Sequence, residues 1–208
     1  MSWYPAAVRH PGPASKVWPE PNQHVGVICH SVEGYIAAAL NELDDGNQPL
    51  SWHFTIDKQG TVYQHYDLSA SCWHAGSHAQ NNLLIGIEHE GVKGEPLTEM
   101  QAAASVALVR WIASECGWAM SRAPASRTLW EHREVPASNT TCPNDRIPWS
   151  RYMPTNDPNH EDNYDTGLTR INAEAAVESI AKIHKQAEGD AFYLIQVINR
   201  TFGVNYHL

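Results

Sequence analysis

The stretch that most constrains this chain is the apolar run at residues 25–29, which is followed by His30. A short run with β-branched residues is typical of a buried central strand, and His30 then lies at its end. His132 and Cys142 follow much later and share one predicted loop. Imidazole and thiolate are ligand types that zinc prefers, and three protein ligands leave a fourth position open. The pattern predicts a site for one Zn²⁺ ion per chain at His30, His132 and Cys142.

Further strands are expected from β-rich runs along the first two thirds of the chain. Residues 52–57 and 61–66 flank Lys58-Gln-Gly60, which predicts a hairpin. Residues 83–88 predict another strand, in which alternation places Ile85 and Ile87 on the face opposite Glu88.

Two helices complete the predicted pattern. Ser31 is expected to cap a helix that runs to residue 43, and Thr98 is expected to cap a helix over 99–116 that ends at Gly117. Strands interleaved with helices predict the α/β class, with a central mixed β-sheet flanked by α-helices.

The domain organisation is expected to be one domain with an appendage, because the chain has 208 residues. Residues 1–153 form the predicted domain, and its first 24 residues are rich in Pro and Trp and predict an irregular arm. Residues 154–168 are polar, acidic and punctuated by proline, which predicts a linker. Residues 169–208 are expected to form a helical extension, whose role the sequence leaves open.

Charge and composition exclude some classes of partner. The formal net charge is −9 and no run of Lys or Arg occurs, which argues against nucleic acid. The N-terminus lacks the features of a signal peptide and no stretch is long enough to span a membrane, so synthesis in the cytoplasm is expected. The spacing of the four cysteines does not resemble a disulfide framework, and we expect them to be reduced.

Five ordered segments carry a family resemblance: Val27-Ile-Cys-His-Ser31, Ser51-Trp-His-Phe-Thr-Ile56 with Gly60-Thr-Val62, Trp73-His-Ala-Gly76, Asn82 with Ile85-Gly-Ile-Glu88, and Glu131-His132 with Cys142. In this order and spacing, over residues 22–150, the chain resembles the zinc-dependent N-acetylmuramoyl-L-alanine amidases. That family includes T7-type phage lysozymes and peptidoglycan recognition proteins. The resemblance implies that peptidoglycan is the substrate. The scissile bond would be the amide between the lactyl group of N-acetylmuramic acid and L-alanine.

The resemblance also implies roles for individual residues. Glu88 matches the family's glutamate and is the expected proton acceptor and donor, with Glu90 as a weaker alternative. Two positions depart from the T7-type pattern: Trp52 stands where a tyrosine is found, and Thr140 stands where a lysine is found. An indole cannot relay a proton, whereas the hydroxyl of Thr140 can still donate to an oxyanion.

Substrate contacts are expected from aromatic and polar residues in the matching segments. Aromatic faces stack on sugar or peptide surfaces, and a histidine there can hydrogen-bond peptide carbonyls. Asn82 is either a strand cap or a substrate contact. The expected groove residues are Trp52, His53, Trp73, His74 and Asn82.

Several functional settings stay open at this point. A phage endolysin is the preferred setting, and a cytosolic amidase that recycles released muropeptides is the second. A peptidoglycan-binding module without catalysis is the rival class, but such binders tend to lose the cysteine ligand, and Cys142 is present. A purely structural zinc site would need a fourth protein ligand, for which His53 and His74 are the candidates.

Overall fold

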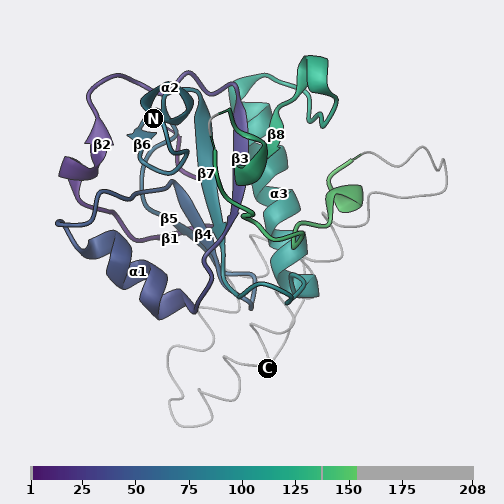
Figure 1. The fold of residues 1–208 in the computed structure, drawn as a ribbon, viewed down its shortest axis with the longest axis horizontal. Coiled ribbons are helices and arrows are strands. Elements are labelled where there is room, and N and C mark those ends of the chain that lie inside the picture. Colours follow the sequence, from purple (N-terminus) through teal and green to yellow (C-terminus); the bar gives the residue numbers. More distant parts are fainter. Residues whose placement is uncertain (1, 137, 154–208) are drawn as a thin grey trace, which may run out of the picture. The chain divides into compact units, whose positions relative to one another are not determined.

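A computed structural model describes residues 2–136 and 138–153 and contains two β-sheets (Figure 1). The larger sheet has the strand order β1-β5-β4-β7-β3-β8, and β2 pairs with β6 in the smaller one. The predicted linker and helical extension lie outside the described residues. The strands are β1 (Val8–Arg9), β2 (Val17–Trp18), β3 (Gly26–Ser31), β4 (Phe54–Ile56), β5 (Val62–Gln64), β6 (Ser71–Cys72), β7 (Leu84–His89) and β8 (Leu129–Glu131). The helices are α1 (Ile36–Asp44), α2 (His78–Asn81) and α3 (Glu99–Cys116), with short 3₁₀ turns at Ala14–Lys16, Pro124–Ser126, His132–Glu134 and Trp149–Arg151.

The larger sheet is mixed, which confirms the predicted class. Strands β4, β7, β3 and β8 run parallel to one another, whereas β4 and β5 form the predicted antiparallel hairpin. The N-terminal arm is less irregular than expected. Its β1 extends the sheet beside β5, and its β2 pairs antiparallel with β6.

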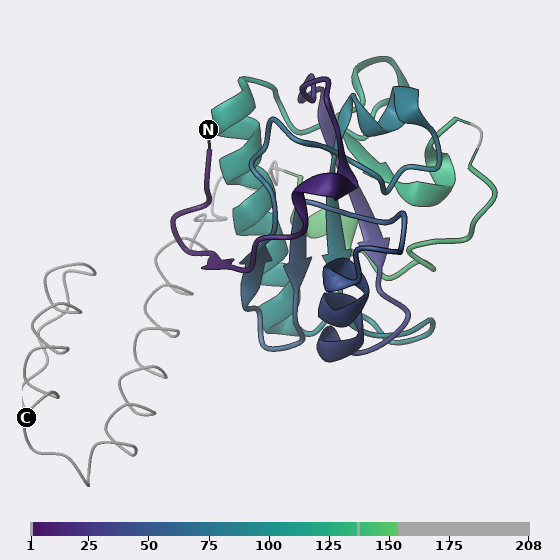
Figure 2. The same ribbon diagram turned by 90° about the vertical axis from the view of Figure 1, so that its left-hand side faces the viewer.

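Helix α3 covers one face of the sheet, and its ends follow from the sequence (Figure 2). The Thr98 hydroxyl accepts a hydrogen bond from the Gln101 amide, and Gly117 adopts the left-handed conformation that terminates the helix. Both boundaries were predicted. The apolar side of α3 packs on side chains of β3, β4, β7 and β8, including Val27, Ile85 and Ile87, to form the main core.

The start of α1 differs from the prediction. Ser31 does not cap a helix, because it is the last residue of β3 and pairs with His89 of β7. The following Glu33 has a positive φ of 52°, and Gly34 forms an isolated bridge with Gly91. Four residues that are neither strand nor helix therefore follow Ser31, and the helix begins at Ile36.

The opposite face of the sheet carries α1 (Figures 1 and 2). Ala39 and Leu43 of α1 pack with Trp52, Tyr66 and Cys72 in a second apolar cluster. None of the helices in the described part of the chain is both long and apolar enough to span a bilayer. This second face, away from α3, is the one that positions the candidate site.

Candidate active site

His30 and Glu88 are neighbours because β3 and β7 are parallel and in register. The two residues pair directly across these strands, and His30 Nδ1 lies 3.9 Å from Glu88 Oε1. Alternation along β7 places Ile85 and Ile87 in the core under α3 and turns Glu88 toward the other face. The sequence alternation thus predicted the face on which Glu88 lies.

His132 and Cys142 reach the same place from the far edge of the sheet. Strand β8 runs parallel to β3, and His132 begins the turn directly after it. The rings of His30 and His132 have centroids 4.6 Å apart, and Cys142 Sγ is 4.0 Å from His30 Nδ1. One ligand atom from each of the three residues lies within 4.8 Å of the others, so the cluster can hold a metal ion.

The loop that carries Cys142 is fastened to β3 by hydrogen bonds. The Ser31 amide donates to Cys142 Sγ at 3.3 Å, and the Arg133 amide donates to the Cys142 carbonyl at 2.9 Å. Four residues later, the buried guanidinium of Arg146 donates to the Ser31 hydroxyl and to the carbonyls of His89 and Glu90. Nothing in the sequence spacing singled out Arg146 for this role.

Burial keeps the protein groups of the cluster uncharged when no cation is bound. It raises the pKa of the Cys142 thiol to about 12, and nearby Glu88 contributes in the same direction. Burial and the neighbouring histidines lower the pKa of His30 well below its ordinary value. A neutral imidazole is ready to coordinate, and a bound cation would stabilise the thiolate, so this donor set fits a metal ion.

The Glu88 side chain is 15% exposed, and its carboxyl group is not fully hydrogen-bonded. Burial, followed by the charge of Glu42, raises the pKa of Glu88 to about 8. Its Oε2 atom has no partner among the described residues. A carboxyl group with a strongly shifted pKa and a free oxygen beside a metal-ligand cluster is a strong candidate for proton transfer.

His74 contacts the candidate ligand His30 and determines which ring nitrogen of His30 is unprotonated and can bind a metal ion. His74 Nε2 lies 3.1 Å from the Leu84 carbonyl and must donate there, so His74 Nδ1 is an acceptor. His30 Nε2 is 3.2 Å from that acceptor and therefore carries its proton. The unprotonated Nδ1 of His30 then faces Glu88 and Cys142. A second partner of this kind commonly orients metal-binding histidines.

Gly86 makes room for this arrangement. A Cβ atom at Gly86 would lie 2.7 Å from Cγ of His74, so a larger residue on β7 would displace the ring. The Gly86 amide donates to Nδ1 of His53, whose Nε2 donates to the Ala70 carbonyl. His53 is fully buried, so it packs behind His74 as part of the scaffold and is not placed to contact a substrate as expected.

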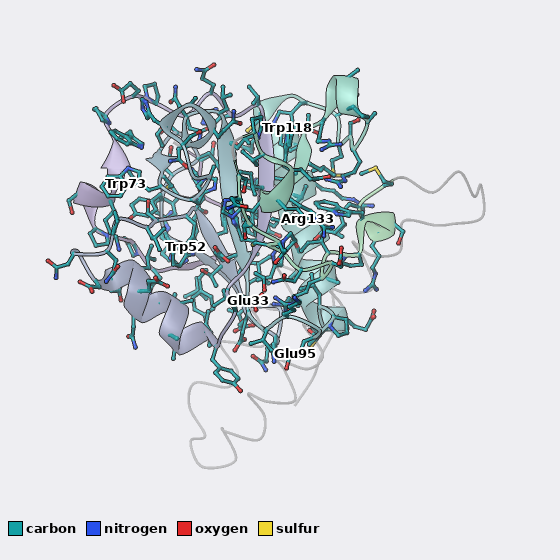
Figure 3. All side chains as sticks on the ribbon, viewed as in Figure 1. Glu33, Trp52, Trp73, Glu95, Trp118 and Arg133 are labelled. Atoms are coloured by element: carbon teal, nitrogen blue, oxygen red, sulfur yellow. The ribbon has the colours of Figure 1, made fainter. Side chains whose placement is uncertain are left out.

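Two cavities flank the ligand cluster. The smaller, about 160 Å³, includes Glu88, Trp52 and Cys142 in its lining, and the larger, about 510 Å³, includes Trp18 and His78. Four residues line both cavities: Leu50, Trp73, His74 and His132. Figure 3 places Trp73 by the β2–β6 sheet, with Trp52 between that sheet and α1.

Three further residues from the sequence analysis lie outside both linings. The side-chain Oδ1 of Asn82 accepts from the Ser71 hydroxyl, and Asn82 is the C-cap residue of α2 rather than the cap of a strand. Thr140 is exposed, and its hydroxyl accepts from the Cys142 amide, so it shapes the ligand loop. Glu90 accepts from two backbone amides, which removes the weaker alternative to Glu88.

The sequence match that decides the family covers this site. A model of the N-acetylmuramoyl-L-alanine amidase family matches residues 20–145, which include all three candidate ligands and Glu88. The chain belongs to the N-acetylmuramoyl-L-alanine amidase family. N-acetylmuramoyl-L-alanine amidase A of Achromobacter lyticus is a relative at 33% identity over 86 residues, which are 41% of this chain and 48% of that protein. The match thus spans about half the length of this curated relative.

Solved structures share the amidase fold. N-acetylmuramoyl-L-alanine amidase LysC from Clostridium intestinale URNW superposes with a TM-score of 0.54 at 20% identity, over 72% of this chain and 95% of that one. A mutant endolysin from Bacillus subtilis gives a TM-score of 0.57 at 21% identity, over 70% and 95% of the two chains. At such identities the likeness establishes the fold.

Proposed function

We propose that this family member is a zinc-dependent amidase that cleaves the bond between N-acetylmuramic acid and L-alanine in peptidoglycan. The observation that carries the proposal is the complete ligand set: ligand atoms of His30, His132 and Cys142 lie within 4.8 Å of one another, beside a carboxyl group with a free oxygen. Two imidazoles and one thiolate suit zinc and leave a position open, which is the arrangement of catalytic sites.

Zinc bound at these three residues would polarise the scissile carbonyl and acidify water. A cation nearby also lowers the pKa of Glu88 from its metal-free value, which leaves a carboxylate at neutral pH. Glu88 then accepts a proton from the water whose oxygen attacks the carbonyl carbon. It returns that proton to the alanine nitrogen as the carbon–nitrogen bond breaks.

The proposal extends to the residues around the ligands. The hydrogen bond from His30 to His74 holds the ligand imidazole in the orientation that presents Nδ1. Trp52 and Trp73 border the reacting bond and exclude water from it. Thr140 is proposed as a hydroxyl donor to the developing oxyanion, with Thr140→Val as its direct test by the loss of kcat.

A bacteriolytic role is the preferred setting, in which the protein is an endolysin that cuts the polymeric wall after its release from the cytoplasm where it is made. Solved structures of similar fold include endolysins, which supports this choice. A recycling amidase would instead prefer released muropeptides, so the ratio of rates on the two substrates separates the settings.

Product analysis tests the proposed activity. Purified peptidoglycan incubated with the zinc-loaded protein should gain alanine amino termini without new reducing sugar ends. A chelator should abolish this gain, and added zinc should restore it. Glu88→Gln is the matched control, because it keeps the three metal ligands and removes the proton acceptor. It should bind zinc and lose about 100-fold or more in kcat. Wall binding by the wild type without new amino termini would favour the non-catalytic module.

A further inference from the structure

Three aromatic rings from separate parts of the chain meet beside the ligand cluster. Trp18 belongs to β2 in the N-terminal arm, Trp73 follows β6, and His78 begins α2. The ring centroid of Trp18 lies 5.8 Å from that of Trp73 and 4.4 Å from that of His78. Trp18 is 39% exposed, a large share for an indole that packs on two other rings. We call these three rings the aromatic shelf.

The arm that carries Trp18 is held firmly. Strand β2 pairs with β6, and two residues before Trp18 the Lys16 ammonium group donates to three carbonyls at the end of α1. The Ser51 hydroxyl links the two sides of the shelf, because it donates to the Lys16 carbonyl and accepts from the Trp73 amide. A surface fixed in this way loses little conformational freedom when it binds a ligand.

The shelf borders the larger cavity, which reaches the ligand cluster at His132. His132 and His74 line this cavity as well as the smaller one, so a molecule with its reacting bond at the cluster extends into either. The larger cavity, about 510 Å³, falls within the usual range for small-molecule sites, whereas the smaller, about 160 Å³, is below it. The larger cavity therefore has room for a pyranose ring with its substituents.

The two cavity linings differ in charged residues, because the smaller includes Glu42 and Glu88. The larger contains no Asp, Glu, Lys or Arg side chain among the described residues, and its imidazole at His78 already faces Glu20 at 3.5 Å. Neither cavity lining holds a Lys or Arg side chain from the described part of the chain, so the carboxylates of a stem peptide find no cationic partner in either cavity. An uncharged pyranose instead offers a C–H face to the rings and hydroxyl and acetamido groups to Ser77 and Asn81 at the edge.

We propose that the aromatic shelf binds the muramoyl sugar ring, and that Trp18 thereby makes the enzyme selective for substrates that carry the glycan. This inference rests on the proposed amidase function. It assigns the sugar part of the substrate to the larger of the two cavities. The stem peptide then leaves the cluster on the α1 side. The N-terminal arm, which lies largely before the family match at residue 20, becomes part of the substrate site.

A pair of substrates that differ only in the sugar tests the inference. One is N-acetylmuramoyl-L-alanyl-D-isoglutamine, and the other is the same dipeptide carrying a 2-methoxypropanoyl group in place of the muramoyl group. Trp18→Ala should lower kcat/KM for the sugar-bearing substrate about 3- to 10-fold, mainly through KM, because one aromatic contact is lost. The loss should be confined to that substrate, and Trp18→Phe should recover most of it. Tyr35→Ala, which removes an aromatic ring that is 71% exposed and lies outside both cavity linings, should match the wild type on both.

The outcomes separate this inference from the proposed function. If the wild type cleaves the sugar-bearing substrate and Trp18→Ala does so at the same rate, the shelf assignment is wrong and the amidase function stands. An equal loss on both substrates, or a loss that grows as the stem peptide is lengthened, would place the peptide on the shelf instead. If the wild type releases alanine amino termini from purified peptidoglycan but cleaves neither compound, the amidase function stands; if it releases none from peptidoglycan either, the amidase proposal fails. When neither compound is cleaved, the shelf assignment is tested by binding alone, through titration of the intrinsic tryptophan fluorescence with N-acetylmuramoyl-L-alanyl-D-isoglutamine. If the shelf binds the sugar, Trp18→Ala should bind this compound more weakly than the wild type does.

Discussion

Replacing His74 with phenylalanine tests whether His74 fixes the ligand imidazole of His30. The variant keeps a ring of similar size and removes the acceptor that lies 3.2 Å from His30 Nε2. The Leu84 carbonyl, which loses its bond from His74, still accepts from the Asn22 amide group at 2.9 Å. The main consequence of the change is therefore an unpaired N–H group on His30.

The size of the effect follows from where the His30 proton can go. With zinc on Nδ1 the proton must stay on Nε2, and a buried N–H group without a partner costs about 1–3 kcal/mol. Without zinc the proton can move to Nδ1, where Glu88 Oε1 and Cys142 Sγ lie at 3.9 and 4.0 Å. The cost falls mainly on the zinc-bound state, so zinc affinity should drop about 5- to 100-fold.

Competition with a chromogenic chelator measures the zinc dissociation constant of each variant. His74→Asn is the matched control, because its side-chain oxygen provides an acceptor near the position of Nδ1, and it should bind zinc nearly as tightly as the wild type. The absorption spectrum of the cobalt-substituted protein should change for His74→Phe and stay the same for His74→Asn. A folded His74→Phe with wild-type zinc affinity would refute the role of the hydrogen bond. Equal losses in both variants would mean that His74 acts through packing alone.

Three other changes have definite expected outcomes. Cys142→Ala should lose zinc and activity but unfold at nearly the same temperature as the metal-free wild type, and an active, zinc-free variant would mean that the ligand set is wrong. Gly86→Ala should destabilise the protein by about 1–3 kcal/mol in urea denaturation, because its Cβ would lie 2.7 Å from His74, whereas Gly46→Ala, with nothing within 4 Å, should not. Burial lowers the pKa of His65 from 6.5 to about 4, so the unfolded chain takes up this proton first as the pH falls, and stability is lost between these values. His65→Gln should reduce that loss between pH 7 and pH 4 by up to about 3 kcal/mol, and an unchanged pH dependence would contradict the assignment.

Local patterns in the sequence determined the elements that depend on neighbouring residues. Helix α3 could be predicted at both ends because its signals, Thr98 and Gly117, act within one turn of the chain. The hairpin of β4 and β5 followed from a short turn between β-rich runs. The helix predicted from Ser31 failed because pairing with His89, far away in the sequence, holds that residue in the sheet.

For the site, too, some features could be predicted from the sequence and others depended on the tertiary structure. The types of His30, His132 and Cys142 pointed to a zinc site because zinc selects its ligands by chemical type, and strand alternation predicted the face of Glu88. The hydrolytic role of these residues was implied by the family resemblance. Side chains that position the ligands could not be found in this way. Their partners lie at sequence separations such as 44 residues for His30 and His74 and 115 for Ser31 and Arg146, and a pairing of that kind exists only once the chain has folded.

The sequence by itself thus determined the class of fold, the limits of α3 and the residue types of the ligand set. Only the tertiary structure decided that His74 serves His30, that His53 and Asn82 belong to the scaffold, and that the arm carrying Trp18 reaches the groove. The physical reason is that ligand chemistry and capping depend on the residue itself and its neighbours. Hydrogen-bond partners and cavity walls depend instead on the register of β3 with β7 and of β2 with β6, which no single segment encodes.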